Sequence, residues 1–210
     1  MKVVIDERLP ARLEKLRLWA GAEVPPALKT RILREFERWQ LVMRQIRELE
    51  TQRAREIRED LSPQGEQTRR LMTLRGIGPN GAWLLVREFF GWRQIRNRRE
   101  LASLAGLSPT LYGSGELERE QGISKAGNRL VRWMMVQLAW CWLQYQPQSE
   151  LSQWYQRRFG QGKSRVRKIG IVALARKLLI ALWKYLETGL VPAGAEVVKA
   201  KKIAVAKQAS

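Results

Sequence analysis

The sequence of 210 residues contains no histidine, a single cysteine and only two aspartates, Asp6 and Asp60. Without histidine, the Ser-His-Asp and Cys-His arrangements of nucleophilic enzymes cannot form. A lone cysteine, Cys141, also excludes a disulfide framework and a structural zinc site. The groups that remain available for catalysis or binding are hydroxyl groups, a few carboxylates and many basic side chains.

Acidic residues are sparse after residue 62, where nine glutamates lie scattered, mostly among basic residues. A two-metal phosphoryl-transfer site needs several carboxylates converging on ions about 4 Å apart. We therefore expect no cofactor and no Mg²⁺ cluster in this chain itself. No apolar run approaches the ~20 residues of a membrane span and we find no signal peptide, which predicts a cytoplasmic protein with no membrane partner.

Positive charge is in large excess, since 39 Lys and Arg against 20 Asp and Glu give a net charge of +19. Such an excess favours a polyanionic partner, because neutralising phosphates releases counterions. Duplex DNA is the expected partner and the nucleoid the expected location, and a merely solvated basic surface is the alternative. The length and a hydrophobic content of 45% allow one or two domains with a real core.

The segment from residue 27 to residue 61 contains neither proline nor glycine. Its apolar residues recur at spacings of four and three, the period of a coiled-coil seam; they are Ile32, Phe36, Trp39, Met43 and Ile46. Glutamates and arginines interleave around them, as on an exposed, ion-paired helix face. We predict an N-terminal helical coiled-coil arm, residues 1–65, that forms a homo-oligomer or an intramolecular hairpin.

The second expected domain, residues 66–192, carries most of the tryptophans. Helices are predicted over residues 66–75, 79–90, 98–105, 125–144, 149–158 and 166–187, with a turn-rich loop over 106–123. No run alternates convincingly with period two, so the predicted fold class is all-α, without a sheet. The tryptophans, Trp92, Trp133 and Trp140 among them, could stack on nucleic-acid bases, but the helical stripe of Trp133 and Trp140 is assigned to the core. Residues 193–210 are expected to form a basic flexible tail.

The turn Gly76-Ile77-Gly78 joins two of these helices, with Pro79 at a natural first helical position. This is the pattern of a helix-hairpin-helix, in which the glycines let the backbone approach a phosphate and the next helix offers free N–H groups. Arg75 lies beside the turn. The pattern indicates contact with the DNA backbone, and an ordinary corner between two packed helices is the alternative.

Ser114 stands in a Gly-Ser-Gly triplet without bulky neighbours, and three cations follow near the expected start of the next helix: Lys125, Arg129 and Arg132. A serine that attacks a phosphodiester needs access in line with the leaving oxygen, and cations that stabilise charge on the phosphoryl oxygens. A solvated turn is the ordinary use of such a triplet. Chemistry alone therefore leaves both interpretations of Ser114 open.

Three other hydroxyl groups compete with Ser114. Ser124 precedes the helix expected at Lys125 and suits an N-cap position. Ser108 stands before a proline and suits a turn. Tyr112 would need histidine or several fixed arginines to act as a recombinase nucleophile, so it ranks lower.

The stretch from Gly160 to Ser164, GQGKS, resembles the end of a phosphate-binding P-loop. A P-loop would need glycine in place of Arg157, a preceding strand and a later acid for Mg²⁺, and none is found. Instead, four cations at the start of the following helix are predicted to form a nucleic-acid backbone patch: Lys163, Arg165, Arg167 and Lys168.

Three motifs in order, LRGIGPNGA, LASLAGLSPTLYGSG and GISKAGNRLVR, resemble one family over about residues 66–190. It is the C-terminal domain of the insertion-sequence transposases that join a RuvC-like domain to a serine-bearing domain, relatives of pilin-type DNA invertases and of recombinases guided by a bridge RNA. The resemblance places the family's catalytic serine on Ser114 and the arginine of its basic motif on Arg132, with Val131 in place of the usual leucine.

The resemblance implies a composite active site, in which RuvC-like acidic residues hold Mg²⁺ near the serine of another subunit. No RuvC-like acidic quartet precedes the arm in this sequence. We therefore expect the C-terminal part of a transposase that acts in DNA transposition or site-specific recombination, is inactive alone, and has a RuvC-like domain and a bridge RNA as partners. The alternatives are a non-catalytic nucleic-acid-binding module or regulator, and a coiled-coil assembly protein with an incidental basic surface.

Overall fold

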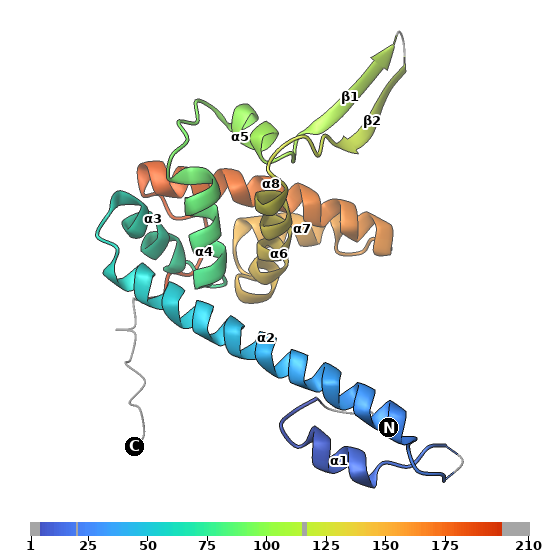
Figure 1. The fold of residues 1–210 in the computed structure, drawn as a ribbon. Helices are drawn as coiled ribbons and strands as arrows, with labels where there is room; N and C mark the ends of the chain where they lie inside the picture. Colours follow the sequence, from blue (N-terminus) through green and yellow to red (C-terminus); the bar gives the residue numbers. More distant parts are fainter. Residues whose placement is uncertain (1–4, 20, 115–116, 199–210) are drawn as a thin grey trace. The chain divides into compact units, whose positions relative to one another are not determined.

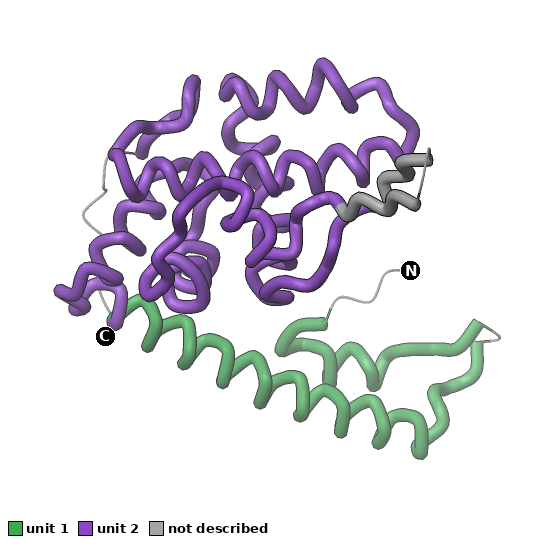
Figure 2. Tube along the Cα trace, turned by 90° about the horizontal axis from the view of Figure 1, so that it is seen from above, with its two compact units in different colours: residues 1–55 green, residues 56–210 purple. Residues whose placement is uncertain are grey.

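The computed structural model describes residues 5–19, 21–114 and 117–198, and the fold is mostly helical. The chain divides into two compact units, residues 1–55 and 56–210 (Figure 2). The division falls within helix α2 (Pro26–Glu59), earlier in the chain than the boundary expected after residue 65.

The first unit contains α1 (Leu9–Lys15) and most of α2, a single helix of 34 residues. The absence of proline and glycine after Pro26 allows this length. Leu9 and Phe36 are both buried, and both line one apolar groove between the segment of α1 and α2. Residues around α1 thus cover the beginning of the predicted seam, whereas Ile46, further along α2, is 41% exposed.

The second unit is built mainly of helices, with a π-helical turn and a two-stranded hairpin (Figure 1). Its elements are α3 (Pro63–Met72), α4 (Pro79–Leu85), η1 (Val86–Phe90), α5 (Arg98–Leu104), β1 (Pro109–Ser114), β2 (Leu117–Ile123), α6 (Arg129–Tyr145), α7 (Glu150–Phe159) and α8 (Ser164–Thr188). Each predicted helix has a counterpart within a few residues, so the all-α fold class is confirmed. None of the helices formed by the described residues has both the length and the apolar character of a membrane span.

Helix α8 lies at the centre of the core, where it packs against α3, α5, α6 and α7. Its residues Leu174, Leu178 and Leu182 are fully buried. Trp142 of α6 is fully buried as well, and its indole N–H donates to the Ser149 hydroxyl at 2.8 Å. Each such side chain contributes ~1.5–3 kcal/mol through burial, so this cluster supplies much of the stability.

Side-chain caps set the beginnings of several helices. In each case the side-chain oxygen accepts a hydrogen bond from a backbone N–H of the first turn; the capping residues are Ser62, Asn97, Asn128 and Ser149. Because Asn128 takes this position, α6 begins at Arg129. The predictions that Ser124 is an N-cap and that the helix begins at Lys125 are therefore wrong.

Strands β1 and β2 form an antiparallel hairpin where the sequence predicts only a turn-rich loop. Tyr112 pairs with Arg119, and Ser114 pairs with Leu117. Polar and glycine residues occupy many positions in both strands, so the alternation of apolar and polar residues is too weak to indicate a strand. The expectation that residues 106–123 hold no sheet is thus wrong, although the hairpin leaves the helical core unchanged.

The chain beyond α8 returns to the turn that follows α3. Val198 N donates to Thr73 O at 2.7 Å, and Arg75 N donates to Glu196 O at 3.2 Å. These backbone bonds tie residues 193–198 into the domain, so this part of the predicted tail is not a free segment. The remainder of the predicted tail lies outside the described residues.

Candidate nucleic-acid interface

The hairpin that carries Ser114 is closed at its base by backbone hydrogen bonds. Ser124 N donates to Ser108 O at 2.8 Å, and Lys125 N donates to Gly106 O at 3.3 Å. The segments that enter and leave the hairpin are therefore bonded to each other beside the strands. This base belongs to the helical domain and provides a fixed support for the two strands.

Two glycines permit the close approach at the hairpin base. A Cβ atom on Gly127 would overlap Leu104 O and Gly106 N, and one on Gly106, whose φ is 66°, would overlap the Arg132 guanidinium. Lys125 itself adopts a left-handed φ of 57°, which costs a non-glycine residue ~1–2 kcal/mol. Lys125 is thus a strained loop residue held in place by its surroundings.

Arg132 supports this loop from α6. Its Nη1 donates to Lys125 O at 3.0 Å and to Gly127 O at 3.5 Å, and the residue is half-buried. The sequence predicts that Arg132 binds nucleic acid beside Arg129, but Arg129 is exposed while Arg132 points its guanidinium at the chain's own carbonyls. Of the predicted pair, Arg129 is therefore accessible to a ligand, whereas Arg132 positions the loop.

The hydroxyl candidates fall into three situations. The backbone of Ser114 ends β1, opposite Leu117, and the side chains of Ser114 and Tyr112 lie outside the described residues. Ser108 lies just before β1 and is half-buried. The Ser124 hydroxyl is buried and has no hydrogen-bond partner among the described residues. Because a nucleophile must reach its phosphate, burial argues against Ser124.

The turn after α3 joins it to α4, so the two helices predicted on either side of Gly76 and Gly78 are both present. Gly76 has a φ of 91°, and a Cβ there would lie 3.1 Å from the Tyr145 Cβ of α6. A Cβ on Gly78, in contrast, would meet no atom within 4 Å. Gly76 thus allows the turn to pack on α6, whereas Gly78 leaves an open approach to the backbone.

Arg75 beside this turn already has an anionic partner. Its Nη1 lies 2.6 Å from Glu196 Oε2, and the two side chains are 51% and 52% exposed. Gln146 strengthens the arrangement, because its Nε2 donates to the carbonyls of both residues at 2.9 Å. A phosphate at Arg75 would have to compete with the Glu196 carboxylate.

The corner between α7 and α8 presents the predicted backbone patch without such competition. Its cations are all exposed; they are Lys163, Arg165, Arg167 and Lys168, with Arg157 and Arg158 from the last turn of α7. The first turn of α8 contains no acidic residue, although the beginning of a helix favours negative charge. Within the described part of the chain, none of these six side chains forms an ion pair. We name this set the α7–α8 corner.

The described residues do not fit a magnesium site. Among them, no three His, Cys, Asp or Glu side chains lie together in a way that could hold a metal ion.

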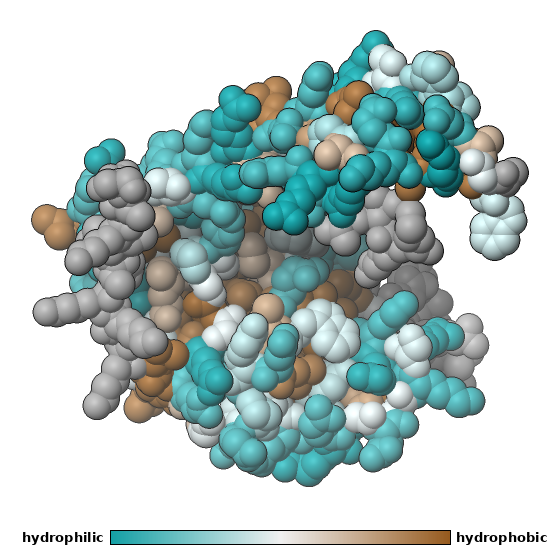
Figure 3. Space-filling model, turned by 90° about the horizontal axis from the view of Figure 1, so that it is seen from below, coloured by the Kyte–Doolittle hydropathy of each residue, from teal (hydrophilic) through white to brown (hydrophobic). Residues whose placement is uncertain are grey.

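Aromatic residues on α6 are more accessible than the sequence predicts. Trp133 is 56% exposed and Trp140 is 41% exposed, so their assignment to the core is wrong. The core is instead filled by Met135, Leu138 and Trp142 of the same helix. On the face drawn in Figure 3, hydrophobic residues lie in separate patches among hydrophilic ones.

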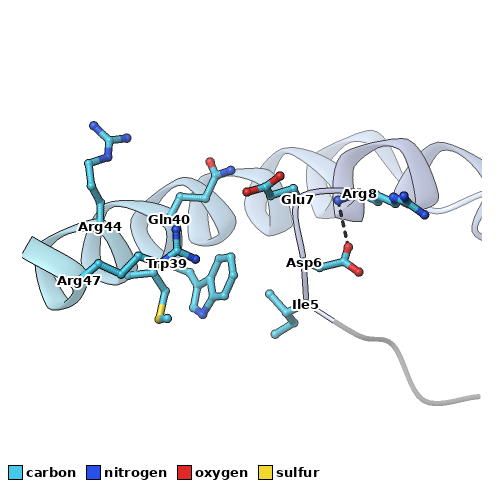
Figure 4. Close-up of a pocket in the computed structure, with 9 residues that line it drawn as sticks. Ile5, Asp6, Glu7, Arg8, Trp39, Gln40, Arg44 and Arg47 are labelled. Carbon is cyan, nitrogen blue, oxygen red and sulfur yellow. Dashed lines mark hydrogen bonds between the residues drawn. The ribbon is translucent and has the colours of Figure 1, made fainter. Parts of the chain in front are cut away.

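The first unit contains an open groove of about 520 Å³ beside α2. Figure 4 shows Ile5, from the segment before α1, facing Trp39 on α2. Charged side chains of both signs line the groove; they are Asp6, Glu7, Arg8, Arg44 and Arg47. An open groove with charges of both signs gives no convergent arrangement of catalytic groups, so it does not belong to the site.

Comparison with known proteins shows what part of the helical domain is similar to. Residues 68–156, which include the turn at Gly76, the hairpin and α6, match the family model described as "Transposase IS116/IS110/IS902 family". The segment is therefore similar to insertion-sequence transposases, as the three sequence motifs indicate.

Two individual relatives extend this similarity beyond the matched segment. The chain is 42% identical over 194 residues to the candidate transposase y4rJ of Sinorhizobium fredii (strain NBRC 101917 / NGR234), covering 88% of this chain and 48% of the relative. It is 30% identical over 172 residues to the transposase for insertion sequence element IS1328 of Yersinia enterocolitica, covering 80% of this chain and 49% of the relative. The chain thus spans about half the length of the curated relatives it matches.

Proposed function

We propose that this chain is the DNA-binding, serine-bearing part of an insertion-sequence transposase. The observation that carries the proposal is the match of residues 68–156 to a transposase family, which includes the hairpin with Ser114. The uncompensated cations of the α7–α8 corner support it, because they suit a phosphate backbone. Duplex DNA is the proposed substrate.

In the proposed reaction, the Ser114 hydroxyl attacks a DNA phosphodiester. A bond forms between Oγ and phosphorus while the bond from phosphorus to one sugar oxygen breaks. The serine gives up its proton and the leaving sugar oxygen takes one up, so the ester count is unchanged and the strand end is held as a phosphoserine. Exposed cations near the hairpin base, Lys125 and Arg129, would stabilise charge on the phosphoryl oxygens.

A RuvC-like partner domain completes the proposed enzyme. The described residues bring no three potential metal ligands together, so the acids that hold Mg²⁺ in such a composite site would come from that partner. We expect no strand cleavage by this chain alone. A bridge RNA belongs to the same proposal as the molecule that would choose the DNA site.

Self-association through α2 is part of the proposal. The beginning of the seam is covered within the first unit, whereas Ile46 is 41% exposed on the seam side and Leu41 is 50% exposed on the opposite side. Ile46→Asp should therefore shift the protein toward monomer in sedimentation, because it places a charge in the seam. The matched control, Leu41→Asp, should leave assembly unchanged, and equal assembly of the two variants would locate the interface elsewhere.

The proposed function is tested by trapping the covalent intermediate. The part of the y4rJ relative that this chain does not match is supplied as a fusion or in trans, with duplex DNA and the guide RNA. Denaturing gels should show a protein–DNA adduct in the wild type and in the Ser124→Ala control, and none in Ser114→Ala. DNA affinity of Ser114→Ala should change less than about twofold, because the substitution removes one small uncharged hydroxyl group and no positive charge.

An adduct that survives Ser114→Ala would overturn the assignment of the nucleophile. Salt-dependent DNA binding without an adduct in any complemented form would favour the non-catalytic binding module. An affinity that does not respond to salt would contradict both functions.

A further inference from the structure

The segment from Trp92 to Arg99, which follows η1, is strongly basic and contains an exposed aromatic residue. Its sequence is WRQIRNRR, with four arginines and no acidic residue. It connects the π-helical turn to α5, outside the α7–α8 corner and the hairpin. We call it the Trp92 segment.

The indole of Trp92 is exposed and yet fixed in orientation. The residue is 63% exposed, while its Nε1 donates to Arg87 O at 3.1 Å. The Arg93 guanidinium lies 4.1 Å from the centre of the Trp92 ring and covers one face of it. The accessible area therefore includes the other face, which is held ready for a flat ligand at little entropic cost.

The cation beneath the indole is itself held by the core. Arg93 also lies 5.7 Å from the centre of the Phe89 ring, and Phe89 is fully buried. Gln64 donates to the carbonyl of Gly91 at 3.0 Å and fixes the backbone just before Trp92. The stack of Trp92 on Arg93 thus rests on the helical domain and is not a loose surface contact.

The remaining arginines of the segment are free to meet anions. Arg96, Arg98 and Arg99 are exposed, and within the described residues none of them forms an ion pair. The neighbouring carboxylate of Glu100 accepts a hydrogen bond from the backbone N–H of Arg96 at 2.9 Å. Three uncompensated guanidinium groups therefore lie within seven residues of a preorganised aromatic face.

We propose that the Trp92 segment binds an unpaired nucleotide of a nucleic-acid strand. The base stacks on the free face of Trp92, and the flanking phosphates pair with Arg96, Arg98 and Arg99. A base inside a duplex is stacked on its neighbours and cannot reach an indole, so the ligand is single-stranded, frayed or extruded. The inference deepens the proposed function by adding a second, strand-selective contact beside the duplex contacts.

The test compares single strands with a duplex on the full chain. Fluorescence anisotropy measures the affinity for oligothymidylate, oligouridylate and a mixed-sequence DNA duplex. Trp92→Ala should weaken single-strand binding by about tenfold while duplex affinity changes less than about twofold, because stacking is lost and the cations remain. Trp92→Phe should keep most of the affinity, since an aromatic face is retained.

The matched control is Trp133→Ala, which removes a tryptophan of similar exposure, 56%, from α6. It should leave single-strand binding unchanged. Equal affinities of Trp92→Ala and Trp133→Ala for single strands, or an equal loss of single-strand and duplex binding in Trp92→Ala, would overturn the inference. Circular dichroism of each variant checks folding, and if Trp92→Ala is unstable, a folded Trp92→Phe that loses single-strand binding would still contradict the stacking role.

The outcomes for the two proposals are separable. Single-strand binding that depends on Trp92, in a protein that does not bind duplex DNA, would support this inference and contradict the proposed function. Duplex binding, together with single-strand binding that does not depend on Trp92, would support the proposed function and contradict this inference. Tighter binding of oligothymidylate than of oligouridylate would assign the segment to a DNA strand, and the opposite order to RNA.

Discussion

The cations of the α7–α8 corner and two other arginines, Arg75 beside the Gly76 turn and Arg132 on α6, have the same positive charge but different surroundings. The corner's cations are exposed and unpaired within the described residues. Arg75 pairs with Glu196, and Arg132 donates to loop carbonyls. A basic sequence motif therefore shows how many cations are present, whereas only the fold shows which of these cations are free to bind phosphate.

The largest effect is expected where backbone packing at the hairpin base leaves no room. Gly127→Ala would drive a Cβ into Leu104 O and Gly106 N, and backbone atoms cannot rotate away. We expect a loss of about 3 kcal/mol or more in the free energy of unfolding, measured by urea denaturation. Gly78→Ala is the matched control, with open space around its Cβ, and should change stability by less than about 1 kcal/mol.

The next prediction separates Arg132 from Arg129. Arg132→Gln removes a charged donor from the Lys125 carbonyl and should lower the free energy of unfolding by about 2 kcal/mol. Arg129→Gln, at an exposed position of the same helix, should change it by less than about 0.5 kcal/mol. Equal stabilities of the two variants would show that Arg132 does not hold the loop.

A smaller effect on stability, which depends on pH, is expected at Asp60, whose carboxylate lies near two further arginines. Hydrogen bonds from Ser62, and then the nearby charges of Arg87 and Arg69, hold the pKa of Asp60 below its usual value. A lowered pKa means that the carboxylate stabilises the fold above its ordinary pKa of ~3.9 and loses this contribution as the pH falls through the folded-state pKa. Asp60→Asn should therefore be less stable than wild type at neutral pH, and the difference in urea midpoints should shrink in acid. A difference independent of pH would contradict this role.

The smallest effect is expected at the exposed pair of Arg75 and Glu196. Glu196→Gln should change the free energy of unfolding by no more than about 1 kcal/mol, because exposed ion pairs contribute little. Freed from its carboxylate, Arg75 should add up to ~0.9 to the log–log slope of DNA affinity against salt. An unchanged slope would mean that Arg75 does not meet phosphate even when it is released.

Local sequence signals predict the helices well and their surroundings less well. The turn at Gly76 between two helices follows from glycine and proline positions in the sequence. The start of α6 is missed, because Ser124 and Asn128 are both capping residue types and only tertiary contacts at the hairpin base decide between them. Trp133 is misplaced because periodicity finds an apolar stripe but does not show whether a neighbour covers it.

The site is predicted as a set of charges but not as a geometry. The cations of the α7–α8 corner can be found in the sequence, since four lie within six residues. The ion pair of Arg75 and Glu196 cannot, because it joins residues 121 positions apart. The Trp92 segment carries a sequence signal, a tryptophan among arginines, but its fixed indole depends on the π-helical turn.

The most direct test of the α7–α8 corner as the phosphate-binding surface is the salt dependence of duplex DNA binding. One variant replaces the corner residues Lys163, Arg165, Arg167 and Lys168 by glutamine, and the matched control makes the same change at Arg31, Arg34, Arg44 and Arg47 of α2. Both lower the net charge by four. We predict that the log–log slope falls by about 0.9 for each phosphate that the corner variant no longer neutralises, and by less than about 1 in total in the control. Equal slopes in the two variants would show that only total charge matters, and would contradict the central claim that the α7–α8 corner is the phosphate-binding surface.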